Sequence, residues 1–551
     1  MTARIDQILL ATRREAMRTA GLWPNRVLLD DLDRHVAERP DHTAVVGYNS
    51  VTGQRTALSY AELAGRSERL AGGLAALGVE PGDVVSYQSP NWWEFMALHL
   101  AVLRLGAVSN PLMPVFRDHE LAFMLGLAES KVFVVPPSFR GFDFVAMAER
   151  LRPRLSALRH VLAVGGAGEA ALERLWERPD DPPAVRAQLA ARRPGPDDVV
   201  ELLYTSGTTG EPKGAMHTSN TLFSALEPYI QRFGLGAADV IFMPSPLAHQ
   251  IGFLYGVVLA VRLGATLVLQ DVWNPAQAVE MITAERTTFT MASTPFLADL
   301  TAEVERRGGG LSGLRLFVSS GAPIPRPLVR RAAAVLGAAI ASSWGMTECN
   351  SVTLTQPDNL PEKIFETDGC PITGMEIRVV DFEGNPLPPD REGRLQTRGP
   401  TLFVGYLRRP EWYCVDADGW FETGDLARVD ADGYVRITGR AKDIIIRGGE
   451  NVPVVEVEGL IYRHPDVQEV AVVAMPDARL GERACAFVAL RDGASLTLPE
   501  LLEFLAGHGL TRNYWPERLE LRDSLPKTPT GKIRKNELRA EARTLAPGAS
   551  A

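Results

Sequence analysis

The sequence contains few cysteines, and they lie far apart in the chain. Cys349, Cys370, Cys414 and Cys485 form no C-x-x-C pair and no cluster with histidine at zinc-ligand spacing, which excludes the common structural zinc motifs. A chain of 551 residues can also bury a large core without covalent staples. Disulfides are therefore not required, and the cysteine usage fits a reducing cytoplasm.

Long apolar runs and a strong excess of positive charge are absent as well. No window approaches the roughly 18 uncharged apolar residues of a membrane span, so we predict none. The N-terminal stretch has no long apolar region before the charges at Arg13 and Glu15, so we expect no signal peptide. The net charge of −9, from 58 basic and 67 acidic residues, gives no basic footprint for a nucleic-acid partner. Together these absences favour a cytoplasmic protein.

Hydrophobic periodicity predicts alternating helices and strands over much of the chain. Apolar residues recur at helical spacing over 60–77 and 93–105, and strand-like runs cover 83–88 and 131–136. A second series of the same kind runs from 221 to 343. Repeated βα units of this type indicate mainly parallel sheets flanked by helices. The fold class predicted for this part is therefore α/β.

The texture of the sequence changes twice after this series. Beyond about Gly369, short strands with Gly and Pro turns indicate a small β-barrel or antiparallel region. After a boundary at 440/441, the remaining residues carry mixed helix and strand signals, which suggests a small α+β domain. We therefore predict a large N-terminal domain at 1–440 and a small C-terminal domain at 441–551. The Pro- and Asp-rich stretch 179–198 is predicted to be a surface loop, and the tail 544–551 is predicted to be disordered.

The most informative stretch is 202–214, which reads LLYTSGTTGEPKG. It places hydroxyls, glycines and one lysine directly after a short apolar run. Such a loop can wrap backbone N–H groups and hydroxyls around a polyphosphate, and Lys213 adds a mobile positive charge. It is not a Walker A loop, because that motif needs Ser or Thr directly after the lysine, and here Gly214 follows. The alternative for this stretch alone is an ordinary surface turn.

This loop resembles that of the adenylate-forming enzymes, which include acyl-CoA synthetases, luciferases and peptide-synthetase adenylation domains. Four further segments resemble the family in the expected order, so the resemblance covers nearly the whole chain: SGAP at 320–323, SWGMTE at 343–348, the stretch 420–440 and PKTPTGKIRK at 526–535. The resemblance implies a two-step reaction. A carboxylic acid and ATP give an acyl-adenylate, which then reacts with coenzyme A, with Mg²⁺ assisting the first step.

The resemblance also implies a set of nucleotide-binding residues. Trp344 offers a π face for the purine where the family usually has tyrosine, Thr347 contacts the α-phosphate as a catalytic residue, and Glu348 supplies a hard oxygen for Mg²⁺. Asp425 resembles the residue that binds the ribose hydroxyls, and Arg440 its partner. The full set implied for ATP and AMP is Thr205, Ser206, Gly207, Thr208, Thr209, Gly210, Lys213, Gly321, Ala322, Pro323, Ser343, Trp344, Gly345, Met346, Thr347, Asp425 and Arg440.

The C-terminal part of the resemblance implies a catalytic lysine on a mobile domain. Lys532 would bridge the substrate carboxylate and the α-phosphate and stabilise charge in the transition state. Lys442 stands at the hinge position. Rotation about it would remove Lys532 and bring in Gly448 and Gly449, which leave room for the pantetheine arm of CoA.

The acyl pocket implied by the resemblance contains His249 and Gly252. The stretch 245–253 carries no Arg or Lys to pair a second carboxylate and no Asp to pair an amine, which favours an apolar mono-acid. We expect His249 to be a gate or wall of the pocket rather than a general base. Segments such as 90–95 and 110–116 resemble cyclohexanecarboxylate-CoA ligases and medium-chain relatives, and a bulky polycyclic acid fits the same features.

Two departures and several alternatives stay open at the level of the sequence. Asn350 stands where glycine is expected, and the stretch 411–416 looks shorter than usual. The acceptor could be a carrier protein acting in trans, or only one half-reaction could be catalysed. A luciferase-like oxidative enzyme and a non-catalytic ATP-binding scaffold are further alternatives. The sequence predicts no oligomeric state.

Overall fold

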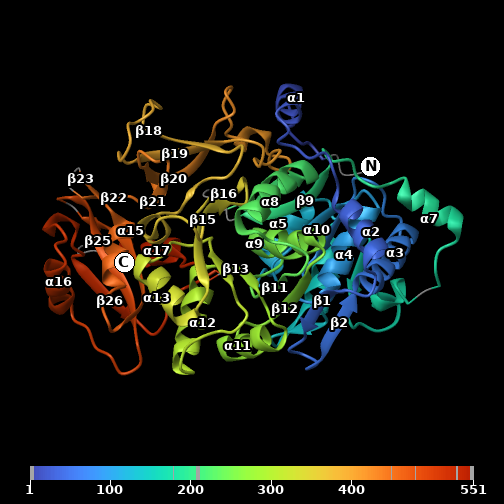
Figure 1. The fold of residues 1–551 in the computed structure, drawn as a ribbon, viewed down its shortest axis with the longest axis horizontal. Coiled ribbons are helices and arrows are strands. Elements are labelled where there is room, and N and C mark those ends of the chain that lie inside the picture. The colour runs from blue at the N-terminus through green and yellow to red at the C-terminus, as the bar shows by residue number, and fades with distance from the viewer. Residues whose placement is uncertain are drawn as a thin grey trace.

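The computed structural model describes residues 5–177, 179–205, 211–447, 450–477, 479–528 and 531–545. Figure 1 shows a broad α/β body, coloured blue to yellow, with the C-terminal elements in red and orange packed at one end. The large N-terminal part with helix-covered sheets and the small C-terminal part agree with the predicted fold class. Within the described chain no helix has the length and apolar character needed to cross a membrane.

The largest sheet has parallel strands at its centre and antiparallel strands at both edges. All residues of two central strands, β12 and β13, are buried, as expected when helices cover both faces of a parallel sheet. In spatial order the described strands are β17 (Cys370–Pro371), β16 (Asn350–Leu354), β15 (Ala339–Met346), β14 (Leu316–Ser319), β13 (Phe289–Ala292), β11 (Val240–Met243), β12 (Thr266–Gln270), β1 (Thr43–Tyr48) and β2 (Arg55–Ser59).

A second sheet carries the hairpin that holds the predicted phosphate loop. The edge strand β10 pairs antiparallel with its neighbour β9, with Lys213 opposite Thr205, and the other pairs are parallel. In spatial order the described strands are β10 (Lys213–Thr218), β9 (Val199–Thr205), β4 (Val108–Pro111), β3 (Val84–Tyr87), β5 (Val132–Val135) and β8 (His160–Ala163). The hairpin β6 (Ser138–Phe139) and β7 (Phe142–Asp143) stands apart.

The short strands predicted after Gly369 form an antiparallel sheet, in the order β18 (Glu376–Val380), β19 (Gly393–Arg398), β20 (Phe421–Val429) and β21 (Val435–Arg440). The C-terminal sheet has the order β23 (Glu450–Val452), β22 (Ile445–Arg447), β25 (Gly481–Leu490) and β24 (Val467–Asp477), with β26 (Arg518–Arg522) paired to β25. Its helices give this part the α+β character that was predicted.

Helices cover these sheets, and their starts often carry the expected capping residues. The helix predicted at 60–77 is α3, where Ser59 and Glu62 form a capping box. The described helices are α1 (Ala11–Thr19), α2 (Leu28–Glu38), α3 (Tyr60–Ala76), α4 (Trp93–Arg104), α5 (Asp118–Leu127), α6 (Phe144–Leu151), α7 (Pro183–Ala190), α8 (Ser219–Phe233), α9 (Gln250–Gly252), α10 (Leu259–Leu263), α11 (Pro275–Ala284), α12 (Thr294–Arg306), α13 (Arg326–Leu336), α14 (Pro361–Glu366), α15 (Val454–Ile461), α16 (Leu498–Gly507) and α17 (Lys535–Leu545).

The stretch 179–198, predicted as a surface loop, is partly helical. Residues Pro183–Ala190 form α7, which begins with Pro183 in its first turn and buries Leu189. The prediction was wrong here because proline does not break a helix when it stands in the first turn, where its fixed φ is suitable. The alanines and the leucine that follow then favour the helix.

Candidate active site

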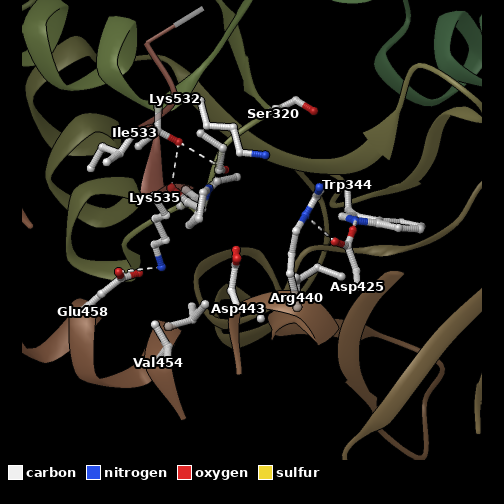
Figure 2. Close-up of a pocket in the computed structure, with 18 of the residues that line it drawn as sticks. Ser320, Trp344, Asp425, Arg440, Asp443, Val454, Glu458, Lys532, Ile533 and Lys535 are labelled. Carbon is white, nitrogen blue, oxygen red and sulfur yellow. Dashed lines mark hydrogen bonds and ion pairs between the residues drawn. The ribbon is translucent and has the colours of Figure 1, made fainter. Parts of the chain in front are cut away.

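A cleft of about 1840 Å³ lies between the large N-terminal part and the C-terminal part of the chain. Figure 2 shows its lining, with Lys532 on one wall and Trp344, Asp425 and Arg440 on another. The structure brings most of the predicted residues to this cleft: Thr205, Lys213, His249, Gly321, Ala322, Pro323, Ser343, Trp344, Gly345, Met346, Thr347, Glu348, Asp425, Arg440 and Lys532.

A buried carboxylate links the predicted purine and ribose positions. The indole N–H of Trp344 donates to Asp425 Oδ2 at 2.8 Å, and Arg440 Nε lies 2.8 Å from Asp425 Oδ1. The Asp425 side chain is 5% exposed, whereas that of Arg440 is 34% exposed. Asp425 is therefore oriented by one neutral donor and one cation, and its free lone pairs can accept further donors such as ribose hydroxyls.

Glu348 is buried and oriented by a tyrosine that the sequence analysis missed. The Tyr406 hydroxyl donates to Glu348 Oε1 at 2.7 Å, and burial, with the nearby carboxylate, raises the pKa of Tyr406, so the hydroxyl stays a donor. Tyr406 and Trp412 also place their rings 5.2 and 5.0 Å from the Lys213 ammonium, in the range of cation–π contacts. Trp412 belongs to the stretch that looked shorter than usual.

The backbone at Thr347 is fixed by a buried histidine. His217 Nε2 lies 2.7 Å from the Thr347 carbonyl oxygen, and its Nδ1 lies 2.9 Å from the Thr221 hydroxyl. Because a carbonyl only accepts, the proton stands on Nε2 and Nδ1 accepts from Thr221. Burial lowers the pKa of His217 to about 4, so this neutral tautomer persists at physiological pH.

Lys532 stands on a tight turn that packs against the N-terminal domain. Its N–H donates to the Thr528 hydroxyl at 3.0 Å, and the Thr528 N–H donates to its carbonyl at 2.7 Å. Figure 2 shows its side chain reaching into the cleft, toward the side that holds Trp344 and Arg440. The preceding Gly531 has φ +79°, and a Cβ there would lie 2.8 Å from Pro295 Cγ on α12. Glycine is therefore needed at 531 when Lys532 occupies the cleft.

We predict that Gly531→Ala slows adenylate formation by about tenfold, because an alanine at positive φ is strained and its methyl group meets Pro295. Thioester formation from a supplied acyl-adenylate should keep its rate, since the resemblance implies that Lys532 leaves the cleft in that step. Single-turnover measurements of the two half-reactions check this.

The matched control is Gly493→Ala. Gly493 has φ +76° with nothing within 4 Å of the added Cβ, so this variant carries the backbone strain without the contact. Equal losses of adenylation in the two variants would contradict the role of the Pro295 contact.

His249 has a structural role at the start of the helix that lines the cleft. Its Nδ1 accepts from the Ile251 N–H at 3.2 Å, and burial together with the Lys532 charge lowers its pKa to about 4. The neutral, capping imidazole fits a pocket wall.

Gly252 is placed differently: it packs against Pro246, whose carbonyl oxygen would lie 2.2 Å from an added Cβ. Close backbone approach thus explains this glycine, which does not line the cleft.

The departure at Asn350 has a backbone explanation. Asn350 has φ 56°, the left-handed region that asparagine tolerates better than most residues. Its Nδ2 donates to the Thr401 carbonyl at 3.2 Å, and its Oδ1 accepts from Gln250 at 2.6 Å.

The Gln250 amide also lies 3.4 Å from Glu201 Oε2. Burial raises the pKa of Glu201 to about 8.

We predict that Glu201→Gln stabilises the protein increasingly as pH rises. The carboxyl ionises near its usual pKa of 4.5 in the unfolded chain and near 8 in the folded protein, so the wild type loses stability as pH rises between these values. The glutamine variant should gain about 2–4 kcal/mol at pH 8 and little at pH 4.5. Chemical denaturation across this range checks it. Exposed Glu38→Gln is the control, and a gain independent of pH would refute the explanation.

Some predicted residues lie outside the described residues. These are Ser206, Gly207, Thr208, Thr209 and Gly210 of the phosphate loop, and Gly448 and Gly449 of the proposed CoA tunnel. The backbone of Lys442 lies in a short 3₁₀ turn, Ala441–Asp443, that follows β21.

The donor set suits magnesium carried by a nucleotide. No group of three or more His, Cys, Asp or Glu side chains able to hold a metal occurs in the part of the chain that the structure describes. Glu348 is a buried carboxylate that lines the cleft, and Asp425, the other predicted site carboxylate, is held by Arg440. Mg²⁺ is typically bound by one or two carboxylates together with substrate phosphates, so Glu348 fits the ion of a Mg²⁺–ATP substrate.

Comparisons with known proteins match the chain over most of its length. The AMP-binding enzyme family matches residues 32–407, and the AMP-binding enzyme C-terminal domain matches residues 456–532. The chain is 36% identical over 533 residues to a medium-chain fatty-acid–CoA ligase of Escherichia coli K12, covering 96% of this chain and 93% of that protein. It is 34% identical over 535 residues to a 2-hydroxy-7-methoxy-5-methyl-1-naphthoate–CoA ligase of Streptomyces carzinostaticus, covering 95% and 94%. Among solved structures, ATP-bound MatB of Rhodopseudomonas palustris is similar, with a TM-score of 0.83, 30% identity, and 95% and 99% of the two chains covered.

Proposed function

Because this chain belongs to the AMP-binding enzyme family, we propose that it is an ATP-dependent acyl-CoA ligase for an apolar mono-carboxylic acid. The proposal rests on one observation, which is that the predicted residues share one cleft. It presents the Lys532 turn opposite the Trp344–Asp425–Arg440 network, with Glu348 and Lys213 on the same cleft. A nucleotide and a carboxylate can thus be held together at one place.

The reaction has two steps in this proposal. A carboxylate oxygen attacks the α-phosphorus of ATP, the bond to the pyrophosphate oxygen breaks, and an acyl-adenylate results. The thiolate of CoA then attacks the acyl carbonyl carbon, and AMP leaves as the thioester forms. Lys532 stabilises the charge that develops in the first step, and Asp425 holds the ribose. Bound Mg²⁺ offsets the repulsion between the carboxylate and the triphosphate.

The same cleft serves both steps if the C-terminal domain, residues 441–551, rotates about Lys442. In the structure Lys532 lines the cleft beside the nucleotide-side residues, which corresponds to the adenylate-forming arrangement. Rotation would withdraw Lys532 and bring Gly448 and Gly449 to the pantetheine path. Such hinge closures let one site carry out two reactions in turn.

The acid is expected to be alicyclic, medium-chain or polycyclic. The helix after His249 presents Gln250, Ile251 and Tyr255 to the cleft, none of which could pair a second carboxylate. Relatives named for a medium-chain fatty acid and for a substituted naphthoate support two of these classes.

Mass spectrometry of the purified protein with ATP, Mg²⁺ and a panel of mono-acids, with and without CoA, tests the proposal. The panel runs from acetate through octanoate, cyclohexanecarboxylate and benzoate to naphthoates. Acyl-CoA and AMP from one group of acids would support the ligase and identify its substrate class. An adenylate that persists with CoA present would favour a carrier protein acting in trans or a single half-reaction. Product from acetate alone would contradict the apolar pocket.

A further inference from the structure

Residues 402–408 form a ribbon that runs beside β10 and carries the contacts to Glu348. Three backbone hydrogen bonds join it to β10: Val404 N–H to the Met216 carbonyl at 2.9 Å, Met216 N–H to the Gly405 carbonyl at 3.0 Å, and Leu407 N–H to the Gly214 carbonyl at 2.8 Å. β10 starts at Lys213, directly after the predicted phosphate loop. The ribbon is thus joined to the strand that leaves that loop.

The ribbon also holds Glu348 at both its backbone and its side chain. The Phe403 N–H donates to the Glu348 carbonyl at 2.8 Å, and the Tyr406 hydroxyl donates to Glu348 Oε1 at 2.7 Å. Glu348 is 5% exposed. A displacement of the ribbon would therefore move the carboxylate that faces the nucleotide.

The side of the ribbon away from β10 is covered by the N-terminal segment 5–23. Ile8 N–H donates to the Val404 carbonyl at 2.6 Å. The Asp6 carboxylate accepts from the Arg408 N–H at 3.0 and 3.1 Å. Farther along, the Trp23 indole N–H donates to the Pro400 carbonyl at 3.0 Å. Figure 1 shows α1 of this segment, in dark blue, at the upper edge of the molecule.

Arg13 makes the densest set of these contacts. Its guanidinium donates to the Phe403 carbonyl at 3.0 Å, to the Leu402 carbonyl and to the Tyr413 hydroxyl at 3.3 Å. Its carbon Cζ lies 5.6 Å from the centre of the Trp23 ring. Charge-assisted hydrogen bonds are stronger than neutral ones, and the planar fork fixes direction as well as distance. Arg13 therefore sets the position of the ribbon next to Phe403.

We propose that the segment 5–23 is a positioning strap for the magnesium end of the nucleotide site, and that Arg13 is its positioning residue, acting on Glu348 through residues 402–406. The segment lies outside both family matches, which cover 32–407 and 456–532. The inference rests on the proposed function only in taking Mg²⁺–ATP as the ligand. Neither Arg13 nor the rest of the segment 5–23 is proposed to touch the reacting atoms.

Calorimetric binding of α,β-methylene-ATP, with saturating Mg²⁺ and with EDTA, tests the strap. In Arg13→Ala the Mg²⁺-dependent gain in affinity should fall about tenfold, while affinity in EDTA stays within about twofold. Tyr406→Phe should lower the same gain. In the double variant the losses should not multiply, because both variants act on one chain of contacts.

Arg18→Ala is the matched control, because Arg18 lies on the same helix but donates to Asp197 and Asn25. It should bind as the wild type does. Arg13→Lys, which keeps a donor cation, should recover part of the gain and provides a second variant if Arg13→Ala does not fold.

Three results would contradict the proposed role of the strap. These are an unchanged Mg²⁺-dependent gain in affinity in Arg13→Ala, equal losses of affinity with Mg²⁺ and with EDTA, or losses of affinity that multiply in the double variant. The assay contains neither a carboxylic acid nor CoA. Binding is therefore measured independently of thioester formation. A wild type that binds the Mg²⁺–nucleotide here but makes no thioester in the mass-spectrometry assay would refute the ligase proposal alone.

Discussion

Replacing Lys532 with alanine is expected to lower the rate of adenylate formation about 10²–10³-fold. Lys532 lines the cleft with the nucleotide-side residues, and in the proposed reaction its ammonium group would supply positive charge where the carboxylate and the α-phosphate meet. Burial lowers the pKa of His249, and the charge of Lys532 adds to this effect. Pyrophosphate release in a single turnover, with ATP and the best acid of the panel, measures the effect.

The second half-reaction provides the internal control for this variant. Thioester formation from a supplied acyl-adenylate should stay within about threefold of wild type, because the proposed rotation withdraws Lys532 in that step and a mutation affects only the steps in which its interaction is made. Lys527→Ala is the matched substitution on the same segment, since Lys527 pairs with Glu469. An undiminished rate of adenylation in Lys532→Ala would remove Lys532 from the catalytic set.

Replacing Asp425 with alanine should lower kcat/KM for ATP about 100-fold, mainly through KM. Asp425 is buried and holds the Arg440 guanidinium at 2.8 Å and the Trp344 indole N–H at 2.8 Å. Removing it leaves both donors without their acceptor and removes the acceptor proposed for the ribose hydroxyls, at a cost of about 3 kcal/mol. Pyrophosphate release at varied ATP concentration measures the change.

Trp344→Phe separates the two contributions at this position. It keeps an aromatic face for the purine and deletes the N–H that donates to Asp425 together with part of the ring surface, so a loss of about fivefold is expected. Asp425→Asn keeps the shape and tests the charge. A KM for ATP that is unaffected in Asp425→Ala would show that the ribose is bound elsewhere.

The site residues that could be predicted from the sequence lie in short contiguous motifs. Glycine, hydroxyl and lysine patterns such as 202–214 depend on local backbone geometry, so they can be recognised without knowledge of the fold. Helices were predicted for the same reason: the strong periodicity at 60–77 corresponds to α3 (Tyr60–Ala76). The order of strands in the sheets depends on long-range packing, which periodicity does not encode.

The residues that were missed act through contacts between distant segments. His217 bonds to the Thr347 carbonyl across 130 positions, and Tyr406 bonds to Glu348 across 58 positions. In the sequence these two residues look like any other histidine or tyrosine, and such residues are common in protein cores. Only the fold shows that their polar atoms orient a site residue. The close approach of the Pro246 carbonyl to Gly252 is likewise a contact that only the fold shows.

The contact between Arg13 and the Phe403 carbonyl, 390 positions apart, has a consequence for synthesis of the protein. At roughly 5–20 residues per second, a ribosome needs on the order of 20–80 s to add the intervening chain. During that time the first residues are outside the ribosome while their docking surface does not yet exist. The proposed nucleotide site is therefore among the last features of the N-terminal domain to be completed, and a nascent chain that ends before about residue 400 should not bind ATP tightly.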